Sequence, residues 1–81
     1  MDRRHEWILT SRLEEAILNG CAYISWSELY KWYGVKRIAA GTWKDLRARW
    51  KELIDNDDSE LQYVPGSGGL FVFDGERVRS A

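Results

Sequence analysis

The sequence has little of three residue types that often define a protein class: among 81 residues it holds one cysteine, one histidine and one proline. A single cysteine excludes an intrachain disulfide, and one cysteine with one histidine cannot complete a structural zinc site. No apolar run approaches the roughly 18 residues that a membrane-spanning helix needs, and no signal-sequence core follows the charged start. We therefore expect a soluble, unprocessed cytoplasmic protein without a membrane partner.

Residues for catalysis are equally scarce. His5 and Cys21 lie far apart in the sequence, and no nucleophile or carboxylate pair is recognisable. The stretch Gly66–Gly69 lacks the Lys-Ser/Thr ending of a phosphate-binding loop and precedes a predicted strand instead of a helix. We expect no enzyme, no cofactor and no bound metal, and we interpret Cys21 as a small buried hydrophobic residue.

Aromatic residues, in contrast, are abundant: the chain has five Trp, four Tyr and two Phe. Each ring can bury about 150–250 Å², so residues 1–81 can form a single domain without disulfides. Trp43 and Trp50 belong to the core by periodicity. Trp7, Trp26 or Trp32 could instead supply an exposed aromatic patch, and this surplus is the basis for the hypothesis of a homodimer.

Two helices are predicted in the first half of the chain. The first, at about 5–19, has one apolar face and ends at Gly20. Trp7 and Leu18 fall on another side of it, either because the ends fray and pack locally, which we favour, or because they form a second apolar surface. Residues 22–24 predict a short edge strand. Ser25 and Glu28 then form a capping-box pattern that starts a helix at about 26–33, before Gly34.

The second half predicts one helix and a hairpin. Thr42 begins a further helix-start pattern, so a helix is expected at about 42–55. Residues 38–40 could extend it backwards, with Gly41 as an internal weak point, which makes the preceding turn three to eight residues long. The runs 61–64 and 70–73 predict a hairpin with a five-residue tip, Pro65–Gly69. In the tail 74–81, residues 77–79 could add a third strand or fray.

The order of these elements and the spacing of four residues resemble the winged helix-turn-helix family of DNA-binding domains. Leu29 precedes the turn residue Gly34 by five positions, Tyr33 comes directly before it, and the apolar Val35 follows, as in many small phage, plasmid and prokaryotic regulators. The resemblance implies an α+β winged-helix fold with three helices, a short strand after the first helix and a C-terminal β-hairpin wing. It also implies that the third helix lies in the DNA major groove, with the wing beside the backbone.

The charges are segregated although the formal net charge is only −1. Between Lys31 and Lys51 there are seven basic residues and one acidic residue, whereas 52–60 holds five acidic residues and no basic one. On the third helix, three of these cations form an outer stripe that could follow a phosphate backbone or reach a guanine edge; the alternative is an ordinary solvated helix face. The residues predicted to contact double-stranded DNA are Lys36, Arg37, Thr42, Lys44, Arg47 and Lys51.

Two function classes follow from these patterns. The leading expectation is a small DNA-binding protein, most simply a transcriptional regulator. The alternative is a winged-helix module that docks onto a protein of the transcription or replication machinery without binding DNA. The hairpin tip, which contains no Lys or Arg, and the acidic run of 52–60 favour the alternative.

Overall fold

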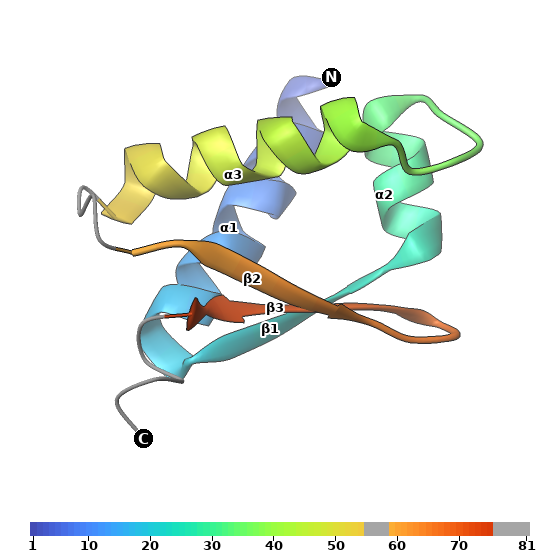
Figure 1. Ribbon diagram of the computed structural model, residues 1–81. Helices are drawn as coiled ribbons and strands as arrows, with labels where there is room; N and C mark the ends of the chain where they lie inside the picture. Colours follow the sequence, from blue (N-terminus) through green and yellow to red (C-terminus); the bar gives the residue numbers. More distant parts are fainter. Residues whose placement is uncertain (55–58, 76–81) are drawn as a thin grey trace.

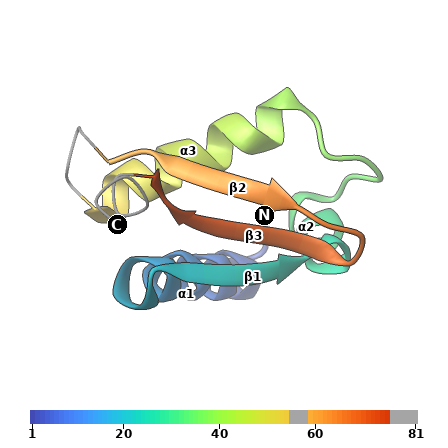
Figure 2. The same cartoon turned by 60° about the horizontal axis from the view of Figure 1, so that its bottom comes forward.

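A computed structural model of the chain describes residues 1–54 and 59–75. Three helices and three strands follow one another along it (Figure 1): α1 (Arg3–Asn19), β1 (Cys21–Ser25), α2 (Trp26–Tyr33), α3 (Ala40–Ile54), β2 (Leu61–Pro65) and β3 (Gly69–Asp74). The α+β class and the succession of elements are those expected from the sequence. The helices lie on one side of the antiparallel sheet, and no described element covers the other face (Figure 2).

Helix α1 begins two residues before the predicted start because Asp2 caps it. The Asp2 carboxylate accepts the Arg4 backbone N–H at 2.8 Å, and this hydrogen bond lowers the pKa of Asp2. The helix ends as predicted at Gly20, whose φ of 97° lies in the left-handed region that favours glycine. The expectation of frayed, locally packed ends is wrong. Trp7 and Leu18 are both helical residues of α1, and 73% and 78% of their surfaces are exposed.

Helix α2 has the predicted bounds, and its capping box is confirmed. The Ser25 hydroxyl accepts the Glu28 backbone N–H at 3.2 Å, and the Glu28 carboxylate accepts the Ser25 backbone N–H at 3.1 Å. At the other end Gly34 adopts a φ of 63°. These signals are local in sequence, which is why they fix the helix to the residue.

Helix α3 begins at Ala40, two residues before the start expected at Thr42, so the alternative in which preceding residues extend the helix backwards is the one that the structure shows. The backbone N–H groups of Thr42 and Trp43 both donate to the Ala39 carbonyl, which places Gly41 inside the first turn. The side chain of Thr42 is buried instead of capping the helix from outside. The turn between α2 and α3 therefore spans residues 34–39, within the predicted length.

The strands form one sheet in the order β1-β3-β2, so the hairpin is not a separate element. Strand β1 lies at an edge, as expected, and pairs with β3 from Cys21↔Phe73 to Ser25↔Gly69. The predicted five-residue tip is shorter, because Pro65 pairs with Leu70 and the chain turns through residues 66–68. Residues 77–79, the candidate third strand of the tail, lie outside the described residues.

The core lies between the inner face of the sheet and the three helices. Its buried apolar residues are Leu9, Leu13, Ala16, Ala22, Ile24, Leu29, Trp32, Leu46, Trp50, Leu61, Leu70 and Val72. One buried polar chain crosses it: the Trp50 indole N–H donates to the Ser59 hydroxyl at 3.1 Å, and that hydroxyl donates to Asp74 at 3.0 Å. These bonds join α3 to the segment before β2 and to the end of β3.

Candidate nucleic-acid interface

The rotation of α3 about its axis is fixed by its aromatic residues. Trp50 is fully buried, and the Trp43 indole stacks on Tyr63 of β2 with ring centroids 4.0 Å apart and planes 3° from parallel. With these residues directed inward, Lys44, Arg47 and Lys51 are exposed on the outer side of α3. The three cations predicted to form an outer stripe are therefore all accessible to solvent.

The acidic residue of this segment, Asp45, is neutralised within the fold. It accepts hydrogen bonds from the Tyr33 hydroxyl at 2.7 Å and from Arg49 at 2.8 Å, and Arg49 also pairs with Glu6 at 3.2 Å. Partial burial opposes ionisation of Asp45, but these two donors outweigh it and lower its pKa. Burial, together with the Asp45 carboxylate, raises the pKa of Tyr33. The sequence did not reveal this cluster, because its members come from three helices.

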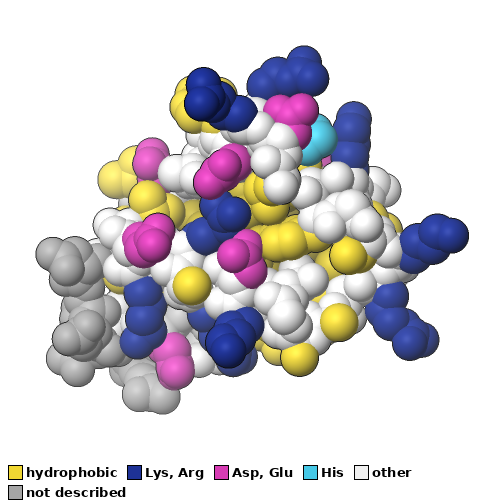
Figure 3. Space-filling view, turned by 90° about the horizontal axis from the view of Figure 1, so that it is seen from above, with side chains coloured by type: hydrophobic (Ala, Val, Ile, Leu, Met, Phe, Trp, Pro, Cys, Tyr) yellow, Lys and Arg dark blue, Asp and Glu magenta, His cyan; other side chains and the backbone are white. Residues whose placement is uncertain are grey.

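The remaining cations of the segment have no ion-pair partner within 1–54 and 59–75. Of the seven basic residues between Lys31 and Lys51, Arg49 alone forms a salt bridge with another described residue. Lys36 and Arg37 are exposed on the turn that leads into α3. Figure 3, which views the molecule from the α3 side, shows Lys and Arg side chains at the margin where this turn lies and mixed charges over the rest of the face.

One predicted DNA contact is buried, and the predicted acidic run lies only partly within the described residues. Thr42 has 7% of its surface exposed, because the helix starts earlier and turns it inward; it is thus removed from the candidate contacts. Of the acidic run, Glu52 and Glu60 are exposed, whereas residues 55–58 lie outside the described part of the chain.

The hairpin tip is attached to the start of α2. The Trp26 indole N–H donates to the Gly66 carbonyl at 2.8 Å, and the Trp26 backbone N–H donates to the Gly68 carbonyl at 3.3 Å. The tip is thus held beside α2. Nothing local in the sequence indicates these contacts, since forty residues separate Trp26 from Gly66.

A groove of about 410 Å³ opens between α2, the turn and α3. It is lined by Trp26, Tyr30, Lys36, Arg37, Ile38 and Trp43. The lining contains two cations, three aromatic rings and no carboxylate. The sequence predicts Lys36 and Arg37 as DNA contacts, but it does not indicate that aromatic residues lie beside them.

The exposed aromatic patch differs from the predicted one. Trp32 is buried and Trp26 is partly buried, so Trp7 alone of the three candidates is largely exposed. A row across the uncovered sheet face is exposed instead: Phe71 pairs with Tyr23 on one side and with Val64 on the other. Cys21 is exposed, so its expected burial is wrong. Its outward position in the alternating pattern of β1 gives the reason.

The described residues contain neither a candidate metal site nor a helix suited to span a membrane. Within residues 1–54 and 59–75, no group of three or more His, Cys, Asp or Glu residues is placed to hold a metal ion. No described helix has the length and apolar character needed to span a membrane. Comparison of the chain with protein-family models, curated proteins and solved structures gives no match.

Proposed function

We propose that this protein is a small winged-helix DNA-binding protein of the regulator type that places α3 in the major groove of double-stranded DNA. The observation that carries the proposal is the set of exposed cations without ion-pair partners in the described chain, on α3 and on the turn before it: Lys36, Arg37, Lys44, Arg47 and Lys51. The order of the helices and strands, and the resemblance at residues 29–35, support the winged-helix assignment.

The geometry of α3 fits a phosphate-contacting helix. Lys44 and Lys51 are seven residues apart, which corresponds to about 10 Å along a helix at 1.5 Å per residue. Arg47 lies between them, and its planar guanidinium can donate two hydrogen bonds to a guanine edge. Asp45 does not oppose this surface, because Arg49 and Tyr33 already bind it.

The hairpin has a smaller part in the proposed complex. Its tip carries no Lys or Arg, and the Gly66 carbonyl is bonded to Trp26. Insertion of a basic wing into the minor groove is therefore not part of the proposal. Most of the affinity should come from α3 and the turn, whose cations release counterions when they neutralise phosphates.

An NMR titration with random-sequence duplex DNA tests the proposal. We expect shifts concentrated between Lys36 and Lys51 and a strong loss of affinity when Lys44, Arg47 and Lys51 are replaced together by alanine. A variant with Arg3, Arg4 and Lys31 replaced by alanine is the matched control, because it removes the same charge from outside α3 and the turn before it. Equal affinity of the α3 variant and the wild type would show that this surface does not bind DNA.

A second function, docking onto another protein, is favoured by the uncovered face of the sheet. Tyr23 and Phe71 are exposed there with ring centroids 5.2 Å apart, and Val64 continues the row. Exposed aromatic rings of this kind mark protein interfaces, and the proposed partner is a second copy of the chain or a protein of the transcription or replication machinery. A Phe71→Ser variant that retains DNA binding but loses self-association in sedimentation would assign this face to a homodimer.

A further inference from the structure

We propose that the groove between α2, the turn and α3 binds an unstacked nucleobase together with an adjacent phosphate, so that the protein also binds single-stranded nucleic acid. This inference rests on the proposed nucleic-acid-binding function and extends it to a second class of strand. The groove is the one lined by Trp26, Tyr30, Lys36, Arg37, Ile38 and Trp43.

The charge of the groove favours an anionic ligand. Lys36 and Arg37 have no ion-pair partner among the described residues, and no carboxylate lines the groove. The groove between α1 and α2 provides the contrast, because there Asp2 and Glu28 line the wall beside the cations. A phosphate can therefore bind Lys36 and Arg37 without displacing an internal partner.

Two of the three aromatic side chains of the groove, Trp43 and Trp26, are held in place. Tyr63 stacks on one face of the Trp43 indole but does not line the groove. The part of the indole that Tyr63 does not cover therefore forms part of the groove wall. The Trp26 indole is fixed by its hydrogen bond to Gly66, whereas Tyr30 is more exposed. Rings that are already fixed lose little conformational entropy when a base stacks on them.

The combination of rings and cations distinguishes a single strand from a duplex. In a duplex the base faces are stacked on one another, and a protein in the groove reaches only their edges. Aromatic side chains gain stacking energy only where a base is unpaired and splayed out. The groove volume of about 410 Å³ falls within the roughly 300–1,000 Å³ of small-molecule sites.

The test compares two single-stranded octamers, one of thymidine and one of abasic nucleotides with the same phosphates, in a fluorescence anisotropy titration. We expect the thymidine octamer to bind about tenfold more tightly, because only it can stack on the rings. Tyr30→Ala should reduce this preference severalfold, whereas Tyr30→Phe should retain it. Trp7→Ala, which removes an exposed aromatic ring of α1 that does not line the groove, is the matched control, and circular dichroism checks the fold of each variant.

Equal affinities for the two octamers, or a preference that Tyr30→Ala leaves unchanged, would overturn the inference. Affinity for a blunt duplex, in which no base is free to stack on Tyr30, reports on the cations of α3 and the turn. A protein that binds the duplex but does not distinguish the octamers loses only the groove assignment. One that distinguishes the octamers but does not bind the duplex loses only the α3 assignment.

Discussion

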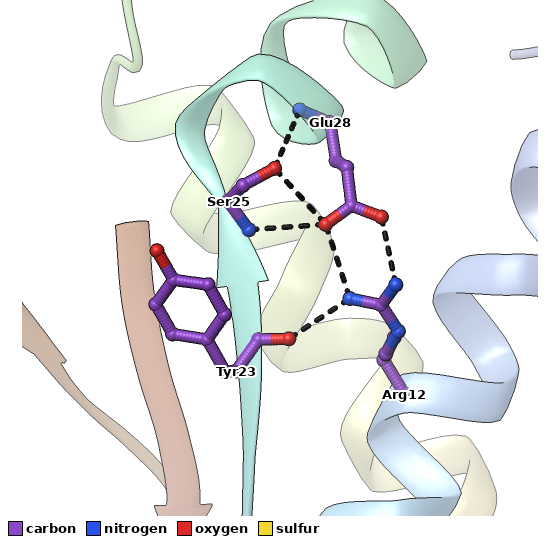
Figure 4. Close-up of polar contacts among 4 residues, drawn as sticks. All are labelled: Arg12, Tyr23, Ser25 and Glu28. Atoms are coloured by element: carbon purple, nitrogen blue, oxygen red, sulfur yellow. Dashed lines mark hydrogen bonds and ion pairs between the residues drawn. The ribbon is translucent and has the colours of Figure 1, made fainter. Parts of the chain in front are cut away.

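Glu28 links three elements of the fold. Its carboxylate accepts hydrogen bonds from the backbone and hydroxyl of Ser25, and it pairs with both terminal nitrogens of Arg12 at 3.1 and 2.8 Å (Figure 4). Arg12 also donates to the Tyr23 carbonyl at 2.9 Å. One carboxylate thus joins α1, β1 and α2. The capping box was predictable from sequence spacing, but Arg12 was not, because it lies sixteen residues away.

Replacement of Glu28 by alanine should lower the free energy of unfolding by about 1–3 kcal/mol, because the variant loses both a cap and a bidentate charge-assisted pair. Urea denaturation followed by circular dichroism measures this. Glu14→Ala is the matched control, since Glu14 is exposed on α1 and has no ion pair in the described chain; it should change stability by less than about 0.5 kcal/mol. Equal effects of the two substitutions would contradict the role assigned to Glu28.

Glu28 should also make stability depend on pH in the acid range. Partial burial acts to raise its pKa, but hydrogen bonds from Arg12 and Ser25 outweigh burial and hold the pKa below the ordinary value of 4.5. A lowered pKa in the folded state means that the ionised carboxylate stabilises the fold above about pH 4.5, and that this contribution is lost as pH falls through the lower folded value.

The Glu28→Gln variant isolates this effect, because glutamine keeps a capping side chain but carries no charge. We expect the stability difference between wild type and variant to be largest near pH 7 and to shrink between pH 4.5 and more acidic conditions. Urea denaturation at a series of pH values measures it. A difference that stays constant down to acid pH would show that the charge of Glu28 contributes nothing.

At the scale of elements, the hairpin packs closely against β1 at Gly69. A Cβ atom added to Gly69 would lie 2.5 Å from the Ile24 carbonyl oxygen and 2.6 Å from the Tyr23 hydroxyl. The first of these atoms belongs to the backbone, so a side chain at this position would force the strands apart. Gly41 on α3 is the opposite case, because nothing lies within 4 Å of an added Cβ.

The two alanine substitutions should therefore have opposite effects. Gly69→Ala should destabilise the protein by about 1–3 kcal/mol through overpacking. Gly41→Ala should stabilise it by about 0.5–1 kcal/mol, because alanine is the better helix former and Gly41 lies inside α3. Thermal unfolding of the two variants beside the wild type measures both. A stabilised Gly69→Ala variant would mean that Tyr23 and β1 do not approach this position.

The elements that sequence predicted best are those whose signals are local. Helix α2 is bounded by the Ser25 cap and by Gly34, and both act within one helical turn. The start of helix α3 was predicted less accurately. Tertiary packing buries Thr42 and outweighs the local tendency of this residue to begin a helix. The pairing of β1 with β3 joins segments almost fifty residues apart, and no periodicity in either strand specifies that pairing.

For the molecule as a whole, sequence predicted the exposed cations but not their neighbours. Periodicity on α3 indicated that Lys44, Arg47 and Lys51 share an outer stripe. The neutralisation of Asp45 and the groove that gathers Trp26, Tyr30 and Trp43 depend on how helices pack. Composition does not indicate the uncovered sheet face, because the alternation along β1 and β3 decides which aromatic residues are exposed.

The near-neutral net charge makes the proposed DNA affinity depend on a few local contacts, and salt dependence can count them. If all five exposed cations of α3 and the turn neutralise phosphates, the logarithm of the association constant should fall with the logarithm of salt concentration with a slope of about −4.5. The triple alanine variant at Lys44, Arg47 and Lys51 should reduce the magnitude of this slope by about 2.7, since each lost contact removes about 0.9.

Fluorescence anisotropy titrations with one labelled duplex at several salt concentrations measure these slopes. The control variant at Arg3, Arg4 and Lys31 has the same net charge as the triple variant and should keep the wild-type slope. This comparison separates contact from overall charge: if both variants weaken binding equally and change the slope equally, the DNA responds to the charge of the whole molecule and α3 is not the contact surface. A change confined to the α3 variant ties the released counterions to that helix.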